Sequence, residues 1–221
     1  MKFTKKAIAG VVAAATMAAA VAPAAQAEGE VSASVGVAST YLWRGKDLGS
    51  GTPAVSGDLS YSNGGFYTGI WGSSGDTDAG TEYDLYLGYG GEVGKFFYDV
   101  SAWTYSYPTG GGKEETGTPG NLAEAVATLG YGPVSATYYQ NVVAPGDDDG
   151  EYSYVTLAAE LGAFGITYGQ HFEGNNDLSH LDLSYAYNDN LSFIISTQIE
   201  VDEPAETTDP TFVVSYSLPI E

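Results

Sequence analysis

Residues 180–189 read HLDLSYAYND, and this stretch decides the fold class of the chain. Apolar or aromatic residues alternate in it with small or polar ones: Leu181, Leu183, Tyr185 and Tyr187 against Asp182, Ser184 and Ala186. A period of two places successive side chains on opposite faces of an extended strand. Residues 211–218 (TFVVSYSL) repeat the pattern, with Phe212, Val214, Tyr216 and Leu218 on one side. Both stretches predict β-strands with one apolar face.

The same alternation predicts twelve strands along the chain. Their approximate spans are 31–44, 54–61, 66–72, 81–89, 96–107, 121–129, 134–141, 151–161, 164–172, 179–187, 191–200 and 211–218. The sixth, residues 121–129, is rich in alanine and equally suits a short helix. Glycine (30 residues) and tyrosine (18 residues) are abundant, and helix-favouring stretches are few. The chain is therefore predicted to be all-β.

Connections between these segments alternate in length. The short ones carry glycine or asparagine, as tight hairpins require, and span 62–65, 90–95, 130–133, 162–163 and 188–190. The long ones span 45–53, 73–80, 108–120, 142–150, 173–178 and 201–210. Strict alternation over an even number of strands is typical of a transmembrane antiparallel up-and-down β-barrel, with short periplasmic turns and longer outer loops. We therefore predict a twelve-stranded barrel with both termini on the periplasmic side.

The N-terminal segment predicts export. Lys2, Lys5 and Lys6 precede an apolar run, and residues 25–27 (AQA) form a small-x-small cleavage pattern. We expect residues 1–27 to be a cleaved signal peptide and residues 28–221 to form the barrel. No cysteine is present, so the exported chain has neither a disulfide framework nor a thiolate metal site.

Charge distinguishes the two ends of the predicted barrel. After residue 27 the sequence has four basic residues, Arg44, Lys46, Lys95 and Lys113, and 28 acidic ones. This balance argues against a nucleic-acid partner, because phosphate binding needs a basic face. Of the acidic residues, 14 fall in the long connections and two in the short ones. One rim of the barrel is therefore expected to be acidic and the other almost uncharged.

Aromatic residues gather toward both ends of the predicted strands, as expected for the two interfaces of a membrane. The interface aromatics that we predict are Tyr41, Trp43, Trp71, Tyr83 and Tyr89. After the leader, no stretch approaches the roughly 20 apolar residues of a membrane helix, so a spanning chain must close as a barrel. The alternative is a soluble, secreted all-β binding module with ordinary surface tyrosines.

Three stretches resemble a known family. VGVASTYLWRGKDL (35–48), PAVSGDLSYSNGGFYTGIWGS (53–73) and GTEYDLYLGYGGEVGKFFYDVSAWTYSYP (80–108) are similar to the TorF-type porin family of Gram-negative outer membranes. The similarity covers about residues 31–107. It implies an outer-membrane β-barrel that conducts small solutes, located in the cell outer membrane of a Gram-negative bacterium. It also implies contacts with membrane lipid, lipopolysaccharide and the barrel assembly machinery.

Counting by two from the apolar faces identifies the residues that should line the lumen. They are Arg44, Asp58, Glu82, Asp84, Asp99, Glu124, Glu160, Asp182 and Glu200. Such a lining should concentrate cations, so we predict a narrow passive channel for small hydrophilic solutes with a weak cation preference. Segment 108–120 is the candidate plug. Arg44 is expected to pair with Glu82, Asp84 or Asp58, and a purely structural role for these charges is equally open.

The sequence also bears on catalysis and on metal binding. Ser179, His180 and Asp182 lie close together and His171 precedes the same loop, but no nucleophile motif accompanies them, so a barrel hydrolase is the less favoured alternative. No cofactor and no metal site are predicted. The acidic run GDDDGE (146–151) lacks the spaced ligands of a calcium loop, although Asp147, Asp148 and Asp149 are candidates for cation contacts, for example with divalent ions bridging to lipopolysaccharide.

Overall fold

The computed structural model describes residues 29–111, 113–145, 152–172, 178–201 and 209–220. The predicted signal peptide, residues 1–27, and the candidate loop contacts Asp147, Asp148 and Asp149 lie outside the described residues. Within the described ranges, no helix has the length and apolar character needed to cross a membrane.

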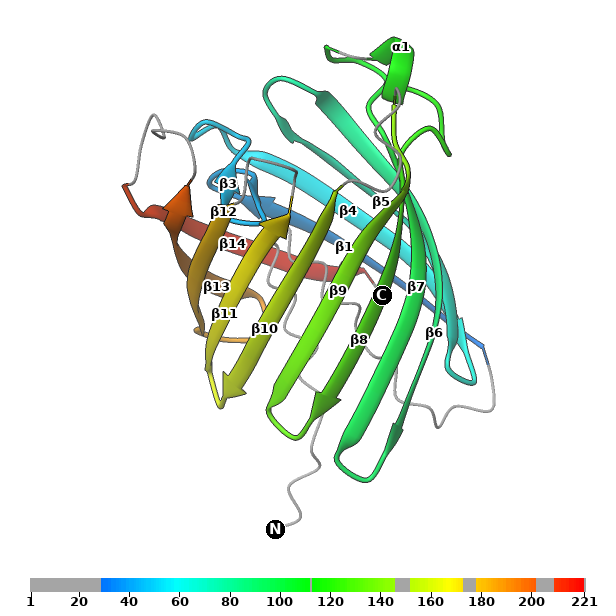
Figure 1. Ribbon diagram of the computed structural model, residues 1–221, viewed down its shortest axis with the longest axis vertical. Helices are drawn as coiled ribbons and strands as arrows, with labels where there is room; N and C mark the ends of the chain where they lie inside the picture. Colours follow the sequence, from blue (N-terminus) through cyan, green and yellow to red (C-terminus); the bar gives the residue numbers. More distant parts are fainter. Residues whose placement is uncertain (1–28, 112, 146–151, 173–177, 202–208, 221) are drawn as a thin grey trace.

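Twelve antiparallel strands close into a barrel (Figure 1). They are β1 (Glu30–Ala38), β4 (Ala54–Asn63), β5 (Phe66–Asp76), β6 (Gly80–Val93), β7 (Phe96–Ser106), β8 (Ala123–Tyr131), β9 (Val134–Val143), β10 (Ser153–Leu161), β11 (Phe164–Phe172), β12 (Leu178–Ala186), β13 (Leu191–Val201) and β14 (Thr211–Ile220). Each pairs with its neighbour along the chain, and β1 pairs with β14, for example Val35 with Leu218. The predicted all-β, twelve-stranded barrel is confirmed.

Short turns lie at one end of the barrel and long connections at the other (Figure 1). The turns after β4, β6, β8 and β10 contain glycines with positive φ, as in Gly64, Gly94, Gly132 and Gly162. Strand β1 begins and β14 ends at the short-turn end, since the first residues of β1 pair with the last residues of β4 and β14. The helix α1 (Lys113–Thr116) lies at the long-loop end.

The distribution of side chains is inverted relative to a soluble protein. Large apolar side chains are exposed on the outer face of every strand, and Leu183 is 50% exposed. Charged and polar side chains are buried on the inner face, where Asp84 is 1% exposed and His180 is completely inaccessible. The alternation in residues 180–189 thus places apolar side chains on the outer face of the barrel and polar side chains on the inner face. An exposed apolar surface of this extent needs an apolar environment.

The first strand is shorter than its alternation predicts. Residues 31–44 were expected to form one strand, but β1 ends at Ala38 and the chain then turns into the barrel. There it forms a small hairpin from β2 (Leu42–Trp43) and β3 (Lys46–Asp47), with Arg44 at φ 47° and Gly45 at φ 80° as the two turn residues. Two consecutive residues with positive φ are typical of a tight two-residue hairpin. The alternation of apolar and polar residues therefore continues past Ala38, although the chain has changed direction. We call residues 39–53 the inner hairpin segment.

The sixth predicted strand is a strand, β8, and not a short helix. The predicted plug is wrong. Segment 108–120 carries α1 at the outer end, and its backbone contacts include one from Gly111 N–H to the carbonyl of Asp78 at 3.0 Å, in the β5–β6 connection. The segment that enters the barrel is instead the inner hairpin segment, because its residues Thr40, Tyr41, Leu42 and Arg44 are buried.

Candidate functional site

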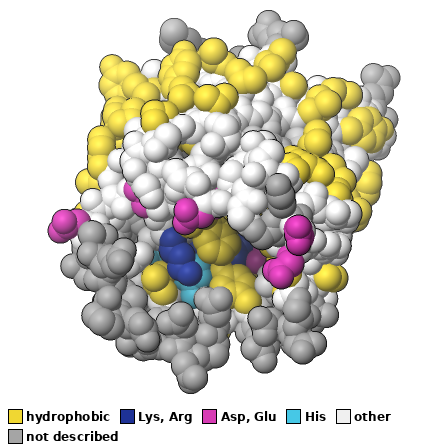
Figure 2. Space-filling model, turned by 90° about the horizontal axis from the view of Figure 1, so that it is seen from above, with side chains coloured by type: hydrophobic (Ala, Val, Ile, Leu, Met, Phe, Trp, Pro, Cys, Tyr) yellow, Lys and Arg dark blue, Asp and Glu magenta, His cyan; other side chains and the backbone are white. Residues whose placement is uncertain are grey.

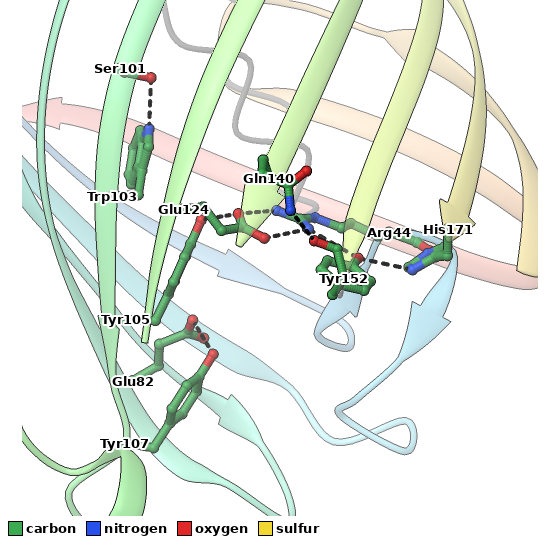
Figure 3. A network of polar contacts seen from close by, with 10 residues as sticks. All are labelled: Arg44, Glu82, Ser101, Trp103, Tyr105, Tyr107, Glu124, Gln140, Tyr152 and His171. Carbon is green, nitrogen blue, oxygen red and sulfur yellow. Dashed lines mark hydrogen bonds and ion pairs between the residues drawn. The ribbon is translucent and has the colours of Figure 1, made fainter. Parts of the chain in front are cut away.

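The tip of the inner hairpin segment places Arg44 inside the barrel (Figure 3). Its guanidinium makes a bidentate pair with Glu124 on β8, with Nη1 to Oε1 at 2.9 Å and Nη2 to Oε2 at 2.6 Å. Nη1 also donates to the hydroxyl of Tyr152 at 3.0 Å. A fork-to-fork pair between guanidinium and carboxylate is a strong charge-assisted contact. Arg44 thereby ties the hairpin to the opposite wall.

His171 on β11 holds the backbone of the same residue. Its Nε2 lies 2.7 Å from the Arg44 carbonyl, which can only accept, so Nε2 carries the proton and donates. Its Nδ1 then accepts from the Tyr152 hydroxyl at 2.9 Å. We call Arg44, Glu124, Tyr152 and His171 the latch cluster. Arg44 is fixed at both its guanidinium and its carbonyl, which offsets the roughly 1–2 kcal/mol cost of a left-handed arginine.

Aromatic faces enclose the guanidinium. Its Cζ lies 4.4 Å from the ring centroid of Tyr139, 4.8 Å from that of Tyr154 and 4.7 Å from that of Trp43. Burial by itself would lower the pKa of Arg44, but Glu124 outweighs this effect and the pKa is raised well above its usual value. Arg44 therefore stays charged at neutral pH.

Packing also holds the hairpin in place. Leu42 is buried in an apolar cluster with Ala38, Ile194 and Val213, and full burial of a leucine side chain is worth about 1.5–3 kcal/mol. Two features require glycine at position 45. Its φ is positive, and a Cβ atom there would lie 2.4 Å from the His180 ring. The amide of Gln198 on β13 donates to the Gly45 carbonyl at 3.1 Å.

Carboxylates on the β4–β7 side of the barrel form a second group, the acidic wall: Asp58, Glu82, Asp84 and Asp99. Three of them accept hydrogen bonds from tyrosine hydroxyls. The pairs are Tyr86 with Asp58 at 2.7 Å, Tyr67 with Asp99 at 2.8 Å, and Tyr41 and Tyr107 with Glu82 at 2.5 and 2.7 Å. No lysine or arginine forms an ion pair with this wall within the part of the chain that the structure describes.

Two of these tyrosines belong to connections. Burial raises the pKa of the Tyr41 phenol well above its usual value, and the nearby Glu82 raises it further. Burial raises the pKa of Tyr107 in the same way, again with a contribution from Glu82. Both phenols therefore keep their protons and act as donors to Glu82.

A third group lies beside the latch cluster. Nδ1 of His180 is 2.9 Å from Oδ1 of Asp182, and Nε2 is 2.7 Å from the Tyr154 hydroxyl. Since the carboxylate can only accept, Nδ1 of the ring donates to it. Ser196 also donates to Asp182 at 2.6 Å. The hydroxyl that meets the histidine belongs to Tyr154 and not to the expected Ser179.

Most residues predicted for the lumen lie on the inner face. Arg44, Glu82, Asp84, Asp99, Glu124 and Asp182 are buried there, and Asp58 accepts from the inward Tyr86. Glu160 is exposed near the short-turn end of β10, and the side chain of Glu200, within β13, lies outside the described residues. Figure 2, viewed from the long-loop end, shows a hollow with basic and histidine side chains in it and acidic ones near its edge.

Three of the five predicted interface aromatics are wrong. Tyr41 is buried and donates to Glu82, and Trp43 stacks on Tyr152 with ring centroids 6.3 Å apart. Trp71 lies directly opposite Asp84 in the β5–β6 pairing, which places both on the inner face. Tyr83 and Tyr89 lie on the outer face, because they alternate with the buried Glu82 and Asp84 along β6.

The predicted partners of Arg44 are also wrong. Glu82, Asp84 and Asp58 were expected, but the pair forms with Glu124, 80 residues away. Sequence reasoning also missed the inward tyrosines that hold the carboxylates. Their signal was available, because Tyr67, Tyr86 and Tyr105 occupy inward positions in the same alternation that identified the acids.

Among the described residues, no group of three or more histidine, aspartate or glutamate side chains is arranged to hold a metal ion. Within the described residues, the interior combines a fully paired latch cluster with an acidic wall that has no basic partner.

Comparisons with known proteins identify one sequence family. Residues 22–204 match the model of a family described as a bacterial protein of unknown function (Gcw_chp). No curated protein matches the sequence. Among solved structures, the chain is similar to a KdgM porin, with a TM-score of 0.48, 8% identity and coverage of 87% of this chain and 99% of that chain. It is also similar to outer membrane phospholipase A from Escherichia coli, with a TM-score of 0.46, 13% identity and coverage of 84% and 88%.

Proposed function

The chain belongs to the Gcw_chp family of bacterial proteins of unknown function, and from that premise we propose that it is an outer-membrane porin. It is a passive, narrow channel for small hydrophilic solutes, with a weak preference for cations. The observation that carries this proposal is the closed barrel with an apolar outer face and a charged inner face. Such a barrel satisfies every strand edge and meets lipid with its apolar side.

The location in the outer membrane follows from two further observations. Residues 1–27 have the pattern of a cleaved signal peptide, and residues 31–107 resemble the TorF-type porins. The exposed apolar belt weighs against the soluble binding module, because it would be in contact with water. Fractionation of cells tests this step. Recovery of the mature protein in the outer-membrane fraction is expected, and recovery in the soluble periplasm would contradict the proposal.

Cation preference rests on the balance of charge inside the barrel. Arg44 is neutralised by Glu124, whereas the four carboxylates of the acidic wall have no basic partner among the described residues. Carboxylates in a low-dielectric enclosure attract cations and repel anions. The tip of the inner hairpin segment is held on the β8–β13 side of the barrel, so the unpaired carboxylates of the acidic wall set the sign of the charge that a solute meets.

Planar bilayers test conduction and selectivity together. The refolded mature protein should conduct, and its reversal potential under a KCl gradient should have the sign of a cation-preferring channel. Absence of conductance would contradict the porin function. A reversal potential of the opposite sign would contradict the cation preference and leave the porin function in place.

A barrel hydrolase is the second candidate, and one observation favours it. Tyr154, His180 and Asp182 form a hydrogen-bonded chain that resembles an acid–base relay. The chain is buried inside the barrel, and its hydroxyl is a phenol, so we rank it below the porin. Lipid or ester hydrolysis that is lost in His180→Ala would favour the hydrolase, and equal background rates in both proteins would remove it.

A further inference from the structure

Asp84 differs from every other carboxylate of the acidic wall. It is only 1% exposed, and neither Oδ1 nor Oδ2 has a hydrogen-bond partner. Its neighbour Glu82 accepts from two tyrosine hydroxyls, and Glu124 is held by Arg44 and Tyr105. Asp99 has one oxygen in the same condition, but its other oxygen accepts from Tyr67. Asp84 is the buried carboxylate with no donor for either oxygen in the described part of the chain.

The surroundings of Asp84 are aromatic and acidic. On the inner wall it lies directly opposite Trp71 of β5 on one side and Tyr105 of β7 on the other. Side chains directly opposite one another in antiparallel strands have Cβ atoms about 4.5–5.5 Å apart, so Trp71 and Tyr105 are the cross-strand neighbours of Asp84. The carboxylates of Glu82 and Glu124 also lie close enough to repel its charge.

A buried, ionised carboxylate without a partner is costly, and two acidic neighbours increase the cost. A cation removes this cost, and neighbouring aromatic rings such as those of Trp71 and Tyr105 attract cations as well. Ca²⁺ takes six to eight oxygen ligands, which one free carboxylate does not supply. A monovalent ion, with its lower charge, is held less tightly and is released more readily, as a channel requires.

We propose that Asp84, between Trp71 and Tyr105, binds a monovalent cation such as K⁺ on the inner wall of the barrel. As a step in permeation this site rests on the proposed porin function, and as a binding site it is measurable without conduction. Asp84 is then the residue that contributes most to cation preference, since the other carboxylates of the wall already have donors.

Thermal unfolding of the refolded mature protein tests binding directly. The transition is followed at constant ionic strength in KCl and in N-methyl-D-glucamine chloride, whose organic cation is much larger than K⁺. We expect the wild type to melt about 2–4 °C higher in KCl, and the increment to saturate as K⁺ replaces the organic cation. Asp84→Asn should remove the increment, because the amide carries no charge.

Glu92→Gln is the matched control. It removes one negative charge from the exposed end of the same strand, β6, and should keep the wild-type increment. Equal increments in the wild type and Asp84→Asn would overturn the site. If Asp84→Asn does not refold, the wild type alone decides. The absence of a saturable K⁺ increment would then overturn the site, because a bound proton or a general effect of salt, and not K⁺, stabilises the Asp84 side chain.

Bilayer recordings separate this proposal from the porin function. In a conducting barrel, Asp84→Asn should lower the K⁺ over Cl⁻ permeability ratio, and Glu92→Gln should not. A silent wild type with an Asp84-dependent thermal increment overturns the porin and supports the site. A conducting wild type whose melting temperature and permeability ratio are both unchanged by Asp84→Asn overturns the site and supports the porin.

Discussion

The two sides of the barrel interior treat charge in opposite ways. In the latch cluster, Arg44 and Glu124 neutralise each other, and Tyr152 and His171 satisfy the remaining polar atoms. In the acidic wall, carboxylates are held by phenols that donate a hydrogen bond and leave the negative charge in place. Full pairing favours a single rigid arrangement, whereas retained charge favours interaction with mobile ions. The first side therefore holds the tip of the hairpin, whereas the second side retains its negative charge.

Arg44→Ala should have the largest effect, because it breaks the latch. It leaves Glu124 buried without its cation, and breaking a buried pair in this way costs about 3–5 kcal/mol. Urea unfolding of the refolded protein should show this loss, and the conductance should rise as the hairpin is released. Lys46→Ala removes a positive charge from the same hairpin, where the ammonium lies 6.0 Å from the Trp43 ring, and should cost less than about 1 kcal/mol. Equal losses in both variants would contradict the latch.

Gly45→Ala should have the next largest effect, since it strains the hairpin without removing a charge. A methyl group at φ 80° would meet the His180 ring at 2.4 Å, and we expect a loss of about 2–3 kcal/mol. Gly51→Ala is the control, because its φ is 73° with open space around it, so only the backbone cost of about 1 kcal/mol applies. The two unfolding free energies, measured side by side, separate packing from backbone strain.

Tyr107→Phe tests the acidic wall and should have a smaller effect. Glu82 loses one donor and keeps the other from Tyr41, so a loss of about 1 kcal/mol is expected. The double variant Tyr41→Phe and Tyr107→Phe should cost more than the sum of its parts, because Glu82 is then left with neither donor. Strict additivity of the unfolding free energies would show that the two phenols do not share Glu82.

The smallest effect is expected from alkaline pH, and it is absent near neutrality. The pKa values of Tyr41 and Tyr107 are raised in the folded state above the value near 10 of the unfolded chain. Above about pH 10 the unfolded phenols lose protons that the folded ones retain, so stability falls as pH rises. The double phenylalanine variant should show a shallower fall than the wild type in unfolding measured from pH 8 to 11. Parallel curves would contradict burial of these phenols.

Local pattern accounts for nearly all of the fold. Eleven of the twelve predicted strands match the structure to within a few residues, and residues 180–189 place His180 and Asp182 inside and Leu183 and Tyr185 outside. The prediction failed where alternation continues through a change of direction. From Ser39 to Arg44 the sequence still alternates, but the chain has left the sheet, so Tyr41 and Trp43 point into the barrel and not toward lipid.

The sequence by itself determined the class of this protein: a barrel of twelve strands, apolar outside, acidic inside, with short turns at one end. The two faces depend on neighbours two residues apart, and the number of strands and the short turns depend on the lengths of consecutive segments, so all of them can be read along the sequence. Only the tertiary structure decided which connection enters the barrel, that Arg44 meets Glu124 across 80 residues, and that Asp84 is left without a donor. Those outcomes depend on the stagger of the twelve strands in the closed barrel, because the stagger sets which inward-facing residues are neighbours. The sequence of a single strand does not reveal this stagger.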